Sequence, residues 1–318
     1  MPMGFGSGYA GAIQTPFAYV TVPQVRAAGI PDETADPEFG VDDARLRSLI
    51  IEMSQWVNRL TDQWFWPIRL QEQVDGNKGS VITIPNMIPI LELFDLRLQR
   101  ENLVNFSYPK FAFQVKERYV MMVTRRVKIP DYPYFVVLDG VFGWLQHDFS
   151  KFKTTTVAVV NPAGGTVAVA DASKCKVGDT VVVGARPEPY AMTFIVTAVD
   201  TTGPFHTISY DPDLAFNCPE IPAGAPVVKY GQVPLQIQRA VLLMIRDRTQ
   251  KVGDIDIFES PFGKGTRLQS ESVEGYSYSM AAMPAVNGHG GGAWTTGNVE
   301  VDDILHQYCT PGMHIGLA

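Results

Sequence analysis

Apolar residues spaced three and four positions apart predict two long helices in this chain. The first begins after Asp42, and the second begins near Pro234 and ends in basic residues, which favour a helix C-terminus. Because such apolar stripes are stable only when buried, we expect the two helices to pack against each other. The expected core positions are Leu46, Leu49, Met53, Val57, Ile237, Val241, Met244 and Ile245.

Two shorter helices are predicted near the ends of the chain. Thr21 is suited to cap one that ends at Gly29, and Asn298 is suited to cap the other. The second follows a stretch with five glycines in residues 288–297 and carries one apolar face. This face comprises Val301, Ile304, Leu305 and Tyr308. A tethered amphipathic helix of this kind either binds a neighbouring surface or folds back on its own domain, and the pattern alone favours neither.

The segment RLTDQWFWPIR, residues 59–69, places three aromatic residues before a proline. Pro67 disfavours helical geometry at Trp66, so we expect the first long helix to end by about residue 65, with Trp64 continuing its apolar stripe. An aromatic ligand cage needs convergent polar partners, and only Gln63 and Arg69 are close by. The pattern therefore favours a structural corner between a helix and a strand.

Strands are predicted between the two long helices. IRLQEQV leads into the reversal VDGNKG, and SVITIP leads back, which predicts a β-hairpin. Further strand-like runs follow within residues 111–145, and from residue 154 the chain becomes rich in β-branched residues and turns. We expect residues 154–228 to form a small all-β module inserted into a host domain.

The predicted fold class is therefore α+β: a helical core with β-hairpins, an inserted all-β domain and extended terminal arms. We divide the chain into an N-terminal arm, 1–18; the first part of the core, 19–153; the inserted module, 154–228; the second part of the core, 229–283; and a glycine-rich linker with a C-terminal segment, 284–318.

The charge and cysteine content limit the class of protein. A net charge of −7 argues against a general nucleic-acid binder, which usually carries a basic face. The three cysteines are far apart and form no C-x-x-C motif, so we expect neither a disulfide framework nor a zinc site. A reducing cytoplasm suits such a chain. We also expect no signal peptide and no membrane span, because no apolar run approaches about 20 residues.

Motifs for catalysis or cofactor binding are not found. FGKGT at 262–266 departs from the phosphate-binding loop pattern, and the five histidines share no ligand spacing. The basic cluster Arg125, Arg126 and Lys128 is more typical of a solvated sheet face than of a phosphate site. A nucleophilic role for Cys175 or Cys218 would need a base that the sequence does not place. We therefore expect no catalytic, cofactor-binding or metal-binding residues, and we do not expect the protein to be an enzyme.

The order of these features resembles the head–tail connector (adaptor) proteins of long-tailed bacteriophages. A short helix precedes the long one that ends in the aromatic corner, LIIEMSQWVNRLTDQWFWP, and QEQVDGNKGSVITIPNMIPILEL follows. The second long helix, GQVPLQIQRAVLLMIRDRTQ, the strand SESVEGYSYSM and the closing helix VEVDDILHQYCTP complete the pattern. The resemblance covers roughly residues 20–105 and 229–310, and residues 106–228 lie outside it.

The resemblance implies a structural protein of the virion neck, made in the host cytoplasm. Such proteins form a ring, generally of twelve copies, that joins the portal of the DNA-filled head to the stopper or tail-completion protein. The ring extends the DNA channel, and DNA passes through it without specific binding. By position, the candidates for portal contact are Val301, Ile304, Leu305 and Tyr308.

A different function remains open for the inserted module. It could hold a fibre, a whisker or a surface glycan on the outside of a virion, which would make the chain a decoration protein. Exposed aromatic residues would support this reading, and the candidates are Tyr190, Phe194, Phe205 and Tyr210, of which we expect at least half to be core.

Overall fold

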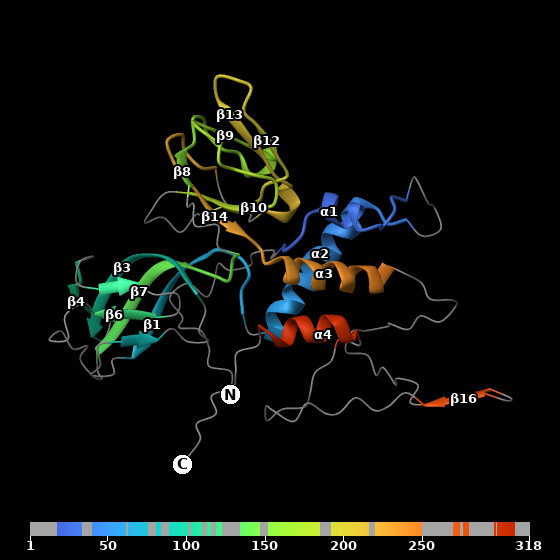
Figure 1. Cartoon of the computed structure of the whole chain (residues 1–318). Coiled ribbons are helices and arrows are strands. Elements are labelled where there is room, and N and C mark those ends of the chain that lie inside the picture. The colour runs from blue at the N-terminus through green and yellow to red at the C-terminus, as the bar shows by residue number, and fades with distance from the viewer. Residues whose placement is uncertain are drawn as a thin grey trace, which may run out of the picture.

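A computed structural model places the chain in a mixed α+β fold (Figure 1). The residues that it describes are 18–33, 40–61, 63–75, 81–83, 89–100, 103–109, 113–115, 119–122, 134–146, 152–184, 192–215, 220–249, 270–273, 276–279, 296 and 298–308. Helices gather on one side of Figure 1, a sheet lies on the other side, and a second group of strands stands above them.

Four α-helices lie within the described residues: α1 (Val22–Ala27), α2 (Asp43–Thr61), α3 (Leu235–Thr249) and α4 (Val299–His306). Their starts follow the predicted caps. Asp42 Oδ1 accepts a hydrogen bond from Arg45 N at 2.5 Å, and Asn298 Oδ1 accepts from Glu300 N at 3.0 Å. The two long predicted helices are thus confirmed, each within a few residues of its expected start.

The helix α2 ends at Thr61, within the limit of about residue 65 that Pro67 sets, but the predicted place of Trp64 on its stripe is wrong. Thr61 Oγ1 donates to Val57 O at 2.8 Å and accepts from Gln63 N at 3.3 Å, so one side chain satisfies groups on both sides of the helix end. Trp64 therefore lies beyond the helix and does not continue its stripe, although its half-buried side chain still packs against the helical core.

The first half of the chain forms two antiparallel sheets. One has the strand order β1-β7-β3-β4, and the other has the order β2-β6-β5. The strands are β1 (Ile68–Asp75), β2 (Val81–Thr83), β3 (Ile90–Arg100), β4 (Leu103–Ser107), β5 (Phe113–Val115), β6 (Tyr119–Met122) and β7 (Tyr134–Phe142).

The predicted hairpin of β1 with β2 is wrong. All eight residues of β1 pair with β7, whereas β2 pairs with β6 in the other sheet. The strand β7 carries the longer apolar run, including the fully buried Val136 and Leu138, and it lies between β1 and β3. The strand β7 is paired along both edges and its apolar side chains are buried, and this stabilises the fold more than the local turn would.

The described residues between 152 and 232 form two further antiparallel sheets, with the orders β11-β10-β14-β8 and β12-β13-β9. The elements are β8 (Phe152–Thr155), η3 (Pro162–Gly164), β9 (Thr166–Val169), β10 (Asp179–Val183), β11 (Met192–Ile195), β12 (Ala198–Asp200), β13 (His206–Ser209), η4 (Pro212–Leu214) and β14 (Pro226–Gln232). They enclose an apolar cluster of their own that includes Val167, Val181 and Phe194. We call this region the β module.

The two connections between the β module and the rest of the protein lie next to each other. Gln146 N, just after β7, donates to Gln232 O at the end of β14 at 2.7 Å. Two residues, Val233 and Pro234, then separate β14 from α3. The two connections lying side by side are what an insertion requires, while the predicted division of the chain into domains stays a prediction.

The remaining described strands, β15 (Ser270–Val273) and β16 (Tyr276–Ser279), pair with each other. The predicted arm lies almost wholly outside the described residues, as do most of the glycine-rich linker and the FGKGT motif.

Candidate functional site at the helical core

The two long helices and α4 share one apolar cluster. All eight expected core positions belong to it: seven are buried, and Leu49 is partly buried against the others. Val57, Ile237, Val241 and Ile245 are fully covered. Since the cluster also contains residues of α1 and of the aromatic corner, these distant parts of the sequence form a single packing unit.

The apolar face of α4 lies inside this cluster. Val301 and Leu305 are 0% exposed, Ile304 is 8% exposed, and Tyr308 is half-buried against them. Of the two readings that the sequence left open, the structure shows the helix folded back on its own chain. Contact with a portal stays a prediction, and in this arrangement it would fall to the exposed side chains Glu300, Asp303, His306 and Gln307.

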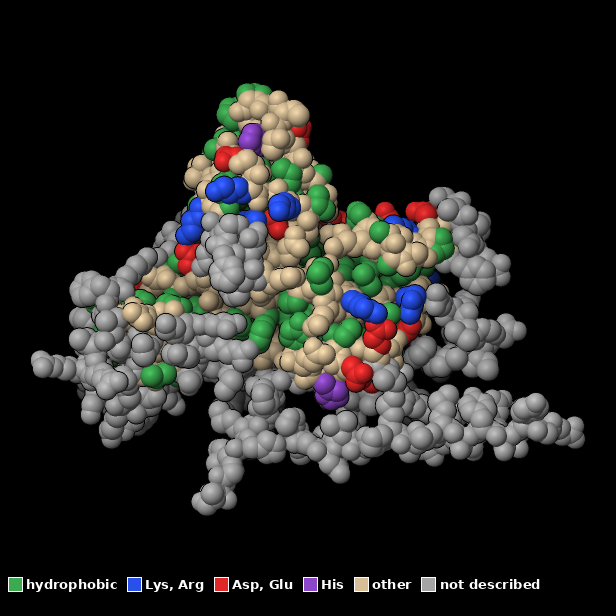
Figure 2. Space-filling view, in the orientation of Figure 1, with side chains coloured by type: hydrophobic (Ala, Val, Ile, Leu, Met, Phe, Trp, Pro, Cys, Tyr) green, Lys and Arg blue, Asp and Glu red, His purple; other side chains and the backbone are tan. Residues whose placement is uncertain are grey.

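Polar contacts between α4 and α3 border the apolar contact. Asn298 Nδ2 donates to Asp247 Oδ2 at 2.7 Å, and Arg239 Nη2 lies 2.5 Å from Glu300 Oε1. In Figure 2, basic side chains lie over α3 and acidic side chains lie below them, toward α4. The contacts set the register of α4 along α3, although such exposed pairs add little stability.

The aromatic corner joins both ends of the chain. The Phe65 ring packs edge-on against Tyr19 and Tyr308, with centroids 5.6 and 5.2 Å apart. Trp144 packs edge-on against Tyr308 and donates its indole N–H to Gln63 Oε1 at 2.8 Å. The rings therefore form a structural corner, as predicted, and the side-chain oxygen of Gln63 is bonded to Trp144 rather than directed at a ligand.

Gly143 allows the corner to close. Its φ is +153°, and a Cβ atom there would lie 2.3 Å from Trp66 O. A larger residue would push the segment after β7 away from Trp66, which is 1% exposed. No pattern in the sequence marks this contact.

Tyr19 is the buried anchor of the N-terminal segment. Its hydroxyl donates to Asn58 Oδ1 and accepts from Phe65 N at 3.1 Å, and its own backbone N donates to Ser54 Oγ at 3.0 Å. Burial raises the pKa of this phenol well above its ordinary value. The residue therefore fixes the segment that leads into α1 against both α2 and the corner.

We expect Tyr19→Phe to lower the free energy of unfolding by about 1–3 kcal/mol, because two buried polar groups lose their partner. Urea unfolding followed by tryptophan fluorescence measures this. Tyr308→Phe is the matched control, since its hydroxyl bonds to Gln236 Oε1 in an exposed contact, and its expected effect is below about 1 kcal/mol. Equal effects of the two substitutions would contradict the anchoring role of Tyr19.

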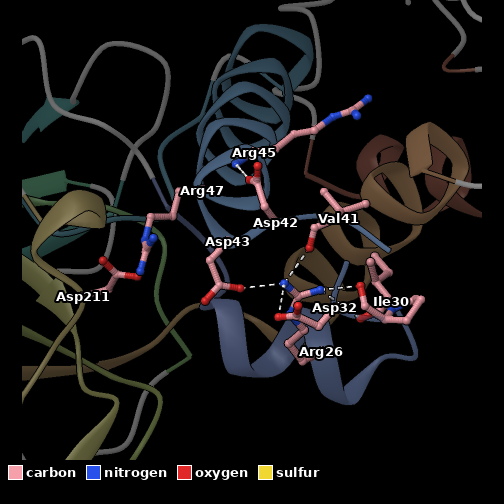
Figure 3. Close-up of polar contacts among 10 residues, drawn as sticks. Arg26, Ile30, Asp32, Val41, Asp42, Asp43, Arg45, Arg47 and Asp211 are labelled. Atoms are coloured by element: carbon pink, nitrogen blue, oxygen red, sulfur yellow. Dashed lines mark hydrogen bonds and ion pairs between the residues drawn. The ribbon is translucent and has the colours of Figure 1, made fainter. Parts of the chain in front are cut away.

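Arg26 ties α1 to the start of α2 (Figure 3). Its guanidinium donates to Val41 O at 2.6 Å and to Asp43 Oδ1 at 2.6 Å, and it lies 3.3 Å from Asp32 Oδ2. It also donates to Pro31 O at 2.5 Å. One side chain thus satisfies the carbonyl groups of Pro31 and Val41, which lie before and after residues 34–39.

Arg47 on α2 reaches the β module in the same view (Figure 3). Its Nε lies 2.8 Å from Asp211 Oδ2 and 3.4 Å from Asp213 Oδ2, and the hydrogen bond to Asp211 raises the pKa of Arg47. The side chain of Asp211 is only 12% exposed. This partly buried pair fixes one side of the module to the helices.

The other side of the β module is fixed to β3. Glu92 accepts from Lys153 Nζ at 2.6 Å and from Tyr230 OH at 2.9 Å. Beneath these contacts, Leu91, Val141, Leu145 and Tyr230 form a small apolar cluster. The module is therefore held by both neighbouring parts of the chain.

Residues with catalytic potential are few in the described part of the chain. Burial raises the pKa of the Cys175 thiol to about 11, which makes it a poor nucleophile at neutral pH. His206 Nδ1 accepts from Ala172 N at 2.7 Å, which is a structural role. No group of three or more metal-ligating residues occurs within the described ranges. Cys218, Cys309, His147, His289, His314, Arg125, Arg126 and Lys128 lie outside them.

The aromatic candidates of the β module divide into core and surface. Phe194 and Tyr210 are buried and stacked, with centroids 4.4 Å apart, whereas Phe205 is 58% exposed. Tyr190 lies outside the described residues. Of the three that are described, two thus belong to the core, and only Phe205 offers a surface ring.

Comparison with known proteins gives no family. No protein-family model matches the chain, and no curated protein sequence matches it either. Among the described residues, no helix is both long and apolar enough to cross a bilayer.

Proposed function

We propose that this protein is a structural component of the neck of a long-tailed bacteriophage. In this proposal, copies of the chain form a ring that joins the portal to the stopper or tail-completion protein and extends the DNA channel. The observation that carries the proposal is the single core built from α1, α2, α3 and α4. Helices from both ends of the chain meet there, as the resemblance to connector proteins implies.

The charge supports this reading. The net charge of −7 suits a channel wall past which DNA moves without being held. The proposal places no catalytic residue in the protein, and it gives the contacts between copies the functional role.

The test is the mass of the purified protein in solution, alone and mixed with the portal protein of the phage that encodes it. We expect a ring, or a monomer that assembles into a ring on the portal, and native mass spectrometry distinguishes the two. A stable monomer that ignores the portal would overturn the proposal.

The portal contact needs a variant that leaves the core intact. Deleting residues 298–318 removes the buried Val301 and Leu305, so it would damage folding as well as any contact. The double variant Asp303→Ala and Gln307→Ala changes only exposed side chains of α4 and keeps the Arg239–Glu300 pair. If α4 contacts the portal, this variant forms a normal core but binds the portal more weakly than the unaltered chain.

A second candidate function rests on the exposed apolar residues of the β module. Val159 is 60% exposed, Val177 is 60% exposed and Phe205 is 58% exposed. Phe205 supplies the exposed ring among these three, and a contact with another virion component would centre on it. If so, Phe205→Ser would weaken the binding of that component to the ring and leave the ring itself intact. If the module has no such role, the substitution would leave this binding unchanged.

A further inference from the structure

The contact of α4 with α3 joins two segments that are distant in sequence. The helix α3 ends at Thr249, and α4 begins at Val299. The nearest described strand before α4 is β16, which ends at Ser279. The 19 residues 280–298 can span up to about 60 Å when extended, so chain length does not confine α4 to its own copy.

The helix α4 depends on the surface that receives it. It has eight residues, too few for a stable helix in isolation, and it buries Val301, Ile304 and Leu305 against α2 and α3. Its register is set by the contacts of Asn298 with Asp247 and of Glu300 with Arg239. The α2–α3 surface of any second copy offers the same apolar positions and the same two polar partners.

One buried group weakens this docking. Asp302 is 6% exposed; its Oδ1 accepts from Thr296 N at 2.7 Å, but its Oδ2 has no hydrogen-bond partner among the described residues. A buried carboxylate oxygen without a partner costs free energy in the docked state. The cost lowers the barrier to release of α4, which exchange between copies requires.

The described surface offers little else for contact between copies. Its large apolar residues with more than a third of their area exposed are Val115, Val159, Val177, Phe205 and Leu235, and they lie on five separate segments. Each copy also carries a net charge of −7, so copies repel one another. Among the described residues, the apolar face of α4 is a contiguous surface that two copies could share.

We propose that α4 is exchanged between copies, so that the α4 helix of each copy packs on α2 and α3 of its neighbour. The inference rests on the proposed ring and names the segment that links its members. Each copy donates one helix and receives one, which is a head-to-tail contact that closes into a ring. Exchange uses the same contacts of α4 with α2 and α3 that the structure shows, so it requires no additional apolar surface.

The test uses a zero-length carbodiimide crosslink across the observed Arg239–Glu300 pair. Arg239→Lys keeps the positive charge and provides the amine that forms an amide with Glu300. Light and isotopically heavy chains carrying Arg239→Lys are mixed, dissociated, reassembled and crosslinked as rings, and peptides are identified by mass spectrometry. We expect the crosslink between positions 239 and 300 to join light and heavy peptides in about half of the pairs at equal mixing, as random exchange between copies predicts.

An internal control is present in every copy. Lys153 Nζ on β8 lies 2.6 Å from Glu92 Oε1 on β3. The bridge between Gln146 and Gln232 holds the β module beside the sheet of β3 within one chain. The crosslink between Lys153 and Glu92 should join only peptides of the same isotope. The chain with its native Arg239 lacks the reactive amine, so it should give no 239–300 product while the control product is unchanged.

The outcomes separate this inference from the proposed function. If rings form but every 239–300 crosslink joins peptides of one isotope, exchange is wrong and the ring stands. If rings form and this crosslink is missing while the control is present, α4 is not docked on α3, and exchange is again wrong. If native mass shows no ring with or without the portal, the proposed function itself fails.

Discussion

Replacing Ile245 with aspartate is expected to unfold the helical core. Ile245 lies on α3, is 0% exposed and belongs to the cluster that joins α2, α3 and α4. A carboxylate there would lose its hydration and gain no partner, at a cost of about 4 kcal/mol or more. This is a large part of the roughly 5–15 kcal/mol by which folded proteins are stable.

Far-UV circular dichroism and urea unfolding measure this effect. The matched control is Leu235→Asp on the same helix, because Leu235 is 62% exposed and is the first residue of α3. An acidic residue in the first helical turn is favourable, so we expect the control to change stability by less than about 0.5 kcal/mol. If Ile245→Asp keeps the midpoint of the unaltered chain, the packing of α2 on α3 is wrong.

The helices are the part of the fold that the sequence predicts best. Their apolar spacing and their caps depend on residues close together in the chain, such as Asp42 with Arg45 and Asn298 with Glu300. The partner of a strand is not local in this way. The turn signal after β1 predicted a hairpin, but β7, some sixty residues along the chain, pairs with all of β1.

The candidate site could be predicted only in part, for the same reason. The core positions on α2 and α3 followed from periodicity, and the structural role of the aromatic corner followed from Pro67. The anchors that join distant segments were missed: Tyr19 to Asn58, and Arg47 to Asp211. A buried tyrosine in a segment without periodicity carries no pattern by which to find it.

The surface on which α4 packs could not be predicted from local patterns either. Its apolar face was evident from spacing, but whether that face meets its own chain or another depends on free energies that no local pattern contains. The structure shows that the α2–α3 surface fits α4, and it shows the buried Asp302 that weakens the fit. Both facts concern pairs of segments that are far apart in sequence.

The β module has a buried ion pair that was also invisible to pattern analysis. Lys229 on β14 and Asp179 on β10 are 2% and 3% exposed, with Nζ and Oδ2 3.3 Å apart. Lys229 Nζ also donates to Lys174 O at 2.9 Å, and Asp179 accepts from Lys176 N and Gln232 Nε2. The pair is well bonded on both sides, as a buried charge requires.

Lys229→Met is expected to destabilise the β module by about 3–5 kcal/mol, because it leaves the Asp179 carboxylate buried without its cation. Urea unfolding measures the loss, and hydrogen exchange locates it in β10 and β14. The control is Lys153→Met, which breaks a pair whose lysine is 57% exposed and should cost less than about 1 kcal/mol. The double variant Lys229→Met and Asp179→Asn should recover much of the loss, since it removes the stranded charge. Recovery would show that the single variant fails through that charge, whereas an equal or larger loss would place the cost in packing.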